Sequence, residues 1–267
     1  KKRLNYGKRS NSKVFRGGEQ SNLSSLKGVG AGNEPFRAAV KSFIKSGFTL
    51  AEVLITLGII GVVAAMTLPS LVNNYKKQQV ITSLQKTYSV LNQAFRMSQA
   101  ENESYEYWEE AYKMGPGEYF DKYWKPYFKI SRSCNSYKEC GYPAYTPWLL
   151  ANGQASTLAV VVPSLRTTFF TPDGVLIAIS AFTGSTDLDD GGAIDNSIYV
   201  DVNGSKRPNQ YGKDMFVFVR TKKGIMPYGY SKDEDTIDED CSSKGTGYRC
   251  AAKLAKDGWQ MKDDYPW

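Results

Sequence analysis

The sequence predicts an α+β fold in which one long N-terminal helix packs on a small antiparallel β-sheet. Two observations lead to this prediction. An apolar run without charge from residue 53 to 75 continues into a segment with helical periodicity. From residue 157 onward, short apolar segments alternate with turn residues, as in a series of β-hairpins. We expect the helix to cover one face of the sheet and so complete a single core.

The first half of this helix is long and apolar enough to cross a membrane. Phe48 to Leu68 is 21 residues, which as a helix spans roughly 31 Å, about one hydrocarbon core. Residues 1 to 47 carry 11 Lys and Arg against two Glu, whereas the rest of the chain has a net charge of −2. Because basic residues stay in the cytoplasm, we expect a single span with its N-terminal side there.

Glu52 lies inside this apolar run, where a carboxylate costs about 2.5–3.5 kcal/mol and usually has a functional partner. One interpretation is an ordinary anchor. A second is a signal peptide cut after Ala65, which releases a soluble protein from Met66. In a third, a cut after Gly47 creates a free amino group on Phe48, and the amine of a neighbouring copy attracts Glu52. This last interpretation gives the carboxylate a partner and sets the axial register between subunits.

The stretch "GFTLAEVLITLGIIGVVAAMTLP" resembles the N-terminal processing and methylation segment of type IV pilins and type II secretion pseudopilins. The resemblance implies cleavage between Gly47 and Phe48 by a prepilin peptidase, followed by N-methylation of Phe48. It assigns Glu52 as the assembly glutamate. It also assigns Pro69 as a helix-kinking proline, since its ring and missing N–H disturb the helical ladder.

The resemblance further implies a pilin-like fold and a structural subunit, not an enzyme, of a bacterial type II secretion pseudopilus or type IV pilus. The expected partners are the prepilin peptidase, other pilin or pseudopilin subunits in a homo- or hetero-filament, the inner-membrane assembly machinery and membrane lipid. The weaker match of "DVNGSKRPNQYGKDMF" is to secretion-type pseudopilins. The alternative is a membrane-anchored or secreted binding domain that uses the segment only for export.

These expectations divide the chain into three parts. Residues 1–47 form a basic, largely disordered leader that is removed on processing. Residues 48–100 form the N-terminal helix, with the membrane span at 48–68, and residues 101–267 form a periplasmic or extracellular globular domain. The subunit starts as a single-pass inner-membrane protein with its N-terminus in the cytoplasm and then enters the filament. Because the part after residue 47 is slightly acidic, no nucleic-acid partner is expected.

The remaining elements follow from local patterns. Residues 81 to 95 place an apolar stripe on one helix face, which should dock on the globular domain. Residues 101–150 are acidic and aromatic, and we expect short helices broken at Pro and Gly with the aromatic residues in the core. We expect strands at 157–162, a hairpin over 167–180 with its turn at 172–174, a half-buried strand within 196–204, and a strand and hairpin over 214–229.

The chain has four cysteines and no histidine, which removes Ser-His-Asp and Cys-His catalysis and His-ligated metal sites. Three disulfide connectivities are open, and free thiols or a metal site are alternatives. The local pairing, Cys134 with Cys140 and Cys241 with Cys250, is the simplest. Disulfides require an oxidising compartment, which agrees with export.

Two runs of carboxylates are candidate Ca²⁺ sites, because hard oxygen ligands on a Gly-containing loop suit this ion. Some pseudopilins that resemble this chain bind calcium, but neither run has the EF-hand spacing. A solvated loop is the simpler interpretation of both, and no other cofactor is expected. The first run contains Asp187, Asp189, Asp190 and Asp195, and the second extends from Asp233 to Asp240.

Overall fold

The computed structural model describes residues 47–109, 111–181, 197–221 and 223–267. It divides into two units, Lys1–Val53 and Leu54–Trp267, and the second contains the globular part. The helices are α1 (Leu50–Asn102), α2 (Ala111–Tyr123), α3 (Glu234–Asp240) and α4 (Cys250–Lys256), with 3-10 turns at Tyr105–Tyr107 and Lys125–Tyr127. The strands are β1 (Arg132–Ser133), β2 (Arg166–Phe170), β3 (Leu176–Ser180), β4 (Ile198–Asp201), β5 (Met215–Thr221) and β6 (Gly224–Pro227).

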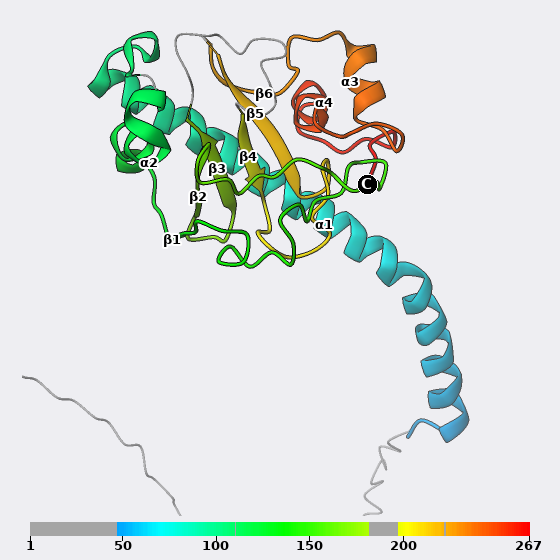
Figure 1. Cartoon of the computed structure of the whole chain (residues 1–267). Helices are drawn as coiled ribbons and strands as arrows, with labels where there is room; N and C mark the ends of the chain where they lie inside the picture. The colour runs from blue at the N-terminus through cyan, green and yellow to red at the C-terminus, as the bar shows by residue number, and fades with distance from the viewer. Residues whose placement is uncertain (1–46, 110, 182–196, 222) are drawn as a thin grey trace, which may run out of the picture. The chain divides into compact units, whose positions relative to one another are not determined.

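The six strands form one antiparallel sheet in the order in which they occur along the chain. One row of paired residues crosses it from Thr168 to Ala178, Tyr199 and Val217. The predicted hairpin is confirmed, since β2 and β3 are joined at Thr171, whose N–H donates to the Val175 carbonyl. The α+β fold is therefore the predicted one (Figure 1).

The second half of α1 lies on one face of this sheet (Figure 1). Its buried residues recur every three or four positions, so they form one stripe along the helix. Of the predicted stripe, Tyr88 is half-buried and stacks on Phe218 of β5 with ring centroids 5.6 Å apart. The docked stripe is confirmed, and its buried members are Ile81, Leu84, Thr87, Leu91, Ala94, Phe95 and Ser98.

Both faces of the sheet are covered, which corrects the prediction of a half-buried strand. All four residues of β4 are buried. Ile198 and Val200 face the core shared with α1, whereas Tyr199 faces a second cluster formed with the segment from Cys134 to Val161. Strand alternation is therefore present, but both sets of side chains are enclosed.

The predicted strand at residues 157–162 is wrong, because this segment forms no ladder and belongs to the layer over the second sheet face. Val160 and Val161 are buried there. The carbonyls of Ala159 and Val160 accept from the guanidinium Nη1 of Arg166 at 2.9 and 3.5 Å. A side chain thus takes the hydrogen bonds that a neighbouring strand would have made.

Most of the described aromatic residues between 101 and 130 form core, as predicted, whereas Tyr107 is exposed. Trp124 is fully buried, and Trp108 stacks on Tyr123 with ring centroids 4.4 Å apart. The predicted break occurs at Gly115, whose φ of 81° interrupts α2 just before Pro116. Because glycine has no Cβ, this left-handed conformation carries little strain there.

Both disulfides have the local pairing: Cys134 with Cys140, and Cys241 with Cys250. The first ties the start of the layer over the second sheet face. The second joins the residue after α3 to the first residue of α4. The C-terminal part is therefore partly helical.

Candidate functional site at the start of the long helix

The candidate site consists of Gly47, Phe48 and Glu52, and Thr49 joins them in the structure. The Glu52 carboxylate Oε2 accepts from the backbone N–H and from the hydroxyl of Thr49, both at 2.8 Å. In return, the Glu52 N–H donates to the Thr49 hydroxyl oxygen at 3.2 Å. This is a capping box, in which the residue before the helix and its third residue satisfy each other's free N–H groups.

The sequence carried a signal for this contact, because Thr49 and Glu52 have the S/T-x-x-E spacing before an apolar run. The prediction considered only a charged partner for Glu52, namely the amino group of Phe48. The structure gives the carboxylate a local partner, which begins α1 at Leu50. Negative charge in the first turn is also favourable to the helix, since the N–H groups there point outward.

The apolar half of α1 has no packing partner within the part of the chain that the structure describes. The helix is long and apolar enough to cross a membrane, and its most apolar 18-residue window has no buried residue. Phe48 is 87% exposed and Met66 is 75% exposed. Pro69 lies inside the helix, which continues past it, and the kink stays a prediction.

The first run of carboxylates, Asp187, Asp189, Asp190 and Asp195, lies outside the described residues. The second run forms α3, and the carboxylates of Asp233, Asp238 and Asp240 have protein partners. Asp233 accepts from the Thr236 N–H at 2.7 Å and begins the helix. Asp240 accepts from the Arg249 N–H at 2.7 Å. Within the residues that the structure describes, no group of three or more Asp, Glu, Cys or His side chains could hold a metal.

The stretch from Asp201 to Phe216 holds two buried carboxylates. Asp201 accepts from the Tyr142 hydroxyl at 2.8 Å and the Trp148 indole at 3.3 Å. Asp214 accepts from the backbone N–H groups of Asn209 and Gln210 at 2.7 and 2.6 Å. Burial raises the pKa of Asp214 to about 6 and that of Asp201 well above its usual value. These groups fix the loop between β4 and β5, and their oxygens are occupied by protein donors.

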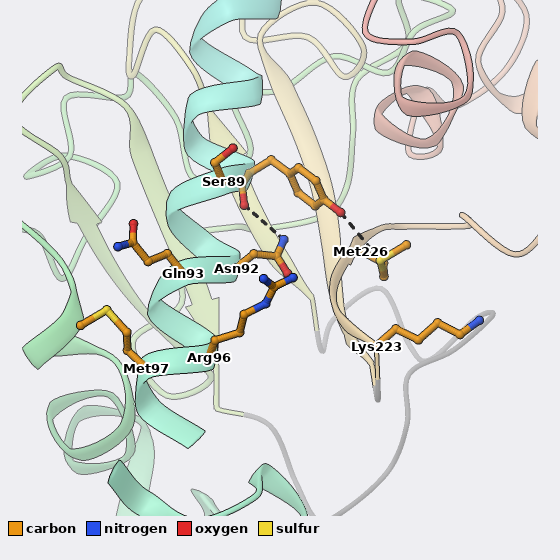
Figure 2. Close-up of a pocket in the computed structure, with 8 residues that line it drawn as sticks. Ser89, Asn92, Gln93, Arg96, Met97, Lys223 and Met226 are labelled. Atoms are coloured by element: carbon orange, nitrogen blue, oxygen red, sulfur yellow. Dashed lines mark hydrogen bonds between the residues drawn. The ribbon is translucent and has the colours of Figure 1, made fainter. Parts of the chain in front are cut away.

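A hollow of about 500 Å³ lies between α1 and the turn that joins β5 to β6 (Figure 2). Asn92 lies at its floor, where its side-chain amide bonds both the N–H and the carbonyl of Ile225 at 3.0 and 2.9 Å. Arg96 and Lys223 give the hollow a positive charge, and its lining contains no carboxylate. The lining therefore offers no acid–base pair for catalysis.

Two family models match the chain. The model described as "Prokaryotic N-terminal methylation motif" matches residues 44–68, which include Gly47, Phe48 and Glu52. The model described as "Family of unknown function (DUF6613)" matches residues 70–267, which is most of the chain.

The chain therefore belongs to the DUF6613 family. No curated protein and no solved structure matches it. This DUF6613 protein carries a prepilin-type segment and is pilin-like, and such proteins are usually structural. The motif implies processing by a prepilin peptidase and assembly with other pilin subunits, and it indicates a membrane-anchored or filament-associated protein.

Proposed function

We propose that this protein is a structural subunit of a bacterial type II secretion pseudopilus or type IV pilus. Prepilin peptidase cuts the chain after Gly47, Phe48 is then N-methylated, and the mature subunit assembles through α1. The observation that carries the proposal is the methylation-motif match over residues 44–68. The exposed apolar half of α1 supports it, because such a surface needs lipid or other subunits to cover it.

In this proposal Glu52 has two successive roles. Before assembly, the N–H and the hydroxyl of Thr49 donate hydrogen bonds to one oxygen of the carboxylate. These bonds lower the free-energy cost of placing the carboxylate in an apolar segment. During assembly, the methylated amine of Phe48 from a neighbouring subunit approaches the exposed carboxylate as an ion pair. Because a low-dielectric surrounding strengthens this attraction, the pair sets the axial position of one subunit against the next.

Before assembly the subunit spans the inner membrane once, with residues 1–47 in the cytoplasm and the globular part on the other side. The assembly machinery then moves it from the lipid into the filament. The proposal includes Ca²⁺ as a ligand of Asp187, Asp189, Asp190 and Asp195, and equilibrium binding of Ca²⁺ to the purified chain tests this.

The first experiment is intact-mass measurement and N-terminal sequencing of the mature protein from its native host. We expect a start at Phe48, with a mass greater by one methyl group. A start at Met66 would show a cut after Ala65 and a released soluble protein, which contradicts the proposal.

A pair of variants then separates the charge of Glu52 from its helix cap. Glu52→Gln keeps an acceptor for the Thr49 N–H but removes the charge. Thr49→Ala removes the hydroxyl from the cap but keeps the charge. We expect both variants to be inserted and cut, Glu52→Gln to give no filaments, and Thr49→Ala to assemble. A binding domain that uses the segment only for export should retain its function in both variants.

A further inference from the structure

A second surface of interest is the basic groove, defined as the hollow of about 1040 Å³ between α1 and the loop that joins β4 to β5. Its helical wall extends from Asn73 to Lys86, and its opposite wall comes from residues 202–214. The groove is separate from the hollow around Asn92.

The basic side chains of the groove outnumber its acidic ones, and one of the basic side chains is paired. Asp173 and Asp214 are its acidic lining residues. Asp173 pairs with Lys86 at 2.7 Å, and Asp214 accepts from two backbone N–H groups. The remaining basic lining residues have no ion pair among the described residues, and they are Lys76, Lys206, Arg207 and Lys213.

The groove begins where the apolar surface of α1 ends. Val72 is 47% exposed and still apolar, and Lys76 follows four residues later, about 6 Å along the helix axis. The headgroup layer beside a hydrocarbon core is of this order of thickness. When α1 lies in lipid with Val72 at the edge of the hydrocarbon core, the end of the groove at Lys76 is therefore at the level of the headgroups, and the groove extends from there along the globular part.

Two aromatic side chains lie at the same level. Tyr75 is 69% exposed. The indole N–H of Trp267 donates to the Asn73 side-chain oxygen at 2.5 Å, which holds the C-terminal residue on α1 at the mouth of the groove. Tyr and Trp next to Lys and Arg are typical of the membrane–water interface, where their rings lie among the headgroups.

We propose that the basic groove binds the headgroups of anionic phospholipids in the leaflet next to the globular part. Bound lipid would hold the globular part close to the membrane while the subunit waits for assembly. The proposal needs α1 to span the membrane, but it does not need cleavage after Gly47. Its failure is therefore distinguishable from failure of the proposed filament function.

The test uses the full chain reconstituted into nanodiscs that contain both phosphatidylcholine and phosphatidylglycerol. Native mass spectrometry then counts the lipids that stay bound. The groove variant combines Lys206→Ala, Arg207→Ala and Lys213→Ala. The control variant removes three exposed lysines outside the groove with the same change in charge, namely Lys129→Ala, Lys138→Ala and Lys244→Ala.

Each basic side chain near an anionic surface strengthens binding by about fivefold. We expect the wild-type chain and the control variant to retain phosphatidylglycerol over phosphatidylcholine, and the groove variant to retain at least about tenfold less. The single variant Lys206→Ala changes an exposed loop position and should retain about fivefold less phosphatidylglycerol. It replaces the triple variant in the test if the triple variant does not fold. The bound anionic lipid should decrease as salt is raised.

Three results would overturn the proposal. Equal loss in the groove and control variants would show a general charge effect. Equal affinity for free glycerol phosphate, measured with the chain in detergent, would show an anion site unrelated to the membrane. Loss of filaments in the groove variant without any preference for phosphatidylglycerol would show that the groove contacts an acidic surface of a neighbouring subunit.

Discussion

Asn92 gives the sharpest test of how α1 is fixed to the sheet. By strand order β6 is at one edge of the sheet, and the Asn92 amide takes the place of a further strand by bonding Ile225 twice. Ile225 is fully buried. Asn92→Ala therefore leaves one N–H and one carbonyl unpaired.

An unsatisfied buried group costs about 1–3 kcal/mol. The hollow beside Asn92 is open enough to admit water, so the cost of leaving each group unpaired should be near the lower end of this range. We expect Asn92→Ala to reduce the free energy of unfolding by about 2–3 kcal/mol. The control is Gln93→Ala at the exposed neighbouring position, with an expected change within about 0.5 kcal/mol.

The assay is urea unfolding of the full chain in mild detergent, followed by tryptophan fluorescence, together with hydrogen exchange at the Ile225 amide. Gly224→Ala supplies an independent check, because φ is +124° there and an added Cβ would lie 2.7 Å from the Asn92 side-chain oxygen. Since both variants disturb one contact, their combined effect should be less than additive. Equal stability of the two single variants Asn92→Ala and Gln93→Ala, with unchanged exchange at Ile225, would refute the reasoning.

Three further predictions concern the globular part. Burial raises the pKa of Asp214 to about 6 from its usual 3.8, so the folded state binds this proton more tightly than the unfolded state. Its contribution to stability should fall as pH rises from about 4 to about 6, and urea titrations should show a flatter pH dependence for Asp214→Asn. Replacing Cys241 and Cys250 together by Ser should lower the free energy of unfolding by about 2–3 kcal/mol. A reductant should therefore destabilise the wild-type chain more than this variant, which lacks the bridge. Lys253→Met should cost about 1–3 kcal/mol in thermal unfolding, because Lys253 pairs with Asp238 at 2.7 Å and is nearly buried, and the exposed Lys256→Met is the control.

Several elements were predictable because their signals are local. The stripe from Ile81 to Phe95 repeats with the helix period, and a helix has one face to bury. The turn at residues 172–174 contains Pro and Gly between two apolar runs, so the hairpin followed. The disulfides agree with the simplest pairing, since residues six and nine positions apart are close in any compact loop.

The candidate site was predictable in part. The motif residues Gly47, Phe48 and Glu52 are at fixed offsets within one short stretch of sequence, so their spacing could be recognised without any tertiary contact. The bond between Thr49 and Glu52 is equally local, since it follows from the capping-box spacing of the two residues. The first carboxylate run lies outside the described residues, and the second became helix because Asp233 caps it.

The sequence by itself determined the long helix, the prepilin-type segment and the hairpins, since each depends on neighbours within a few residues. Only the tertiary structure decided that both faces of the sheet are covered, that residues 157–162 pair with Arg166 and not with a strand, and that Asn92 closes the edge at β6. An apolar run has the same composition in a strand and in a buried loop. Its state depends on which distant group takes its backbone hydrogen bonds, and that choice is made only when the whole core is assembled.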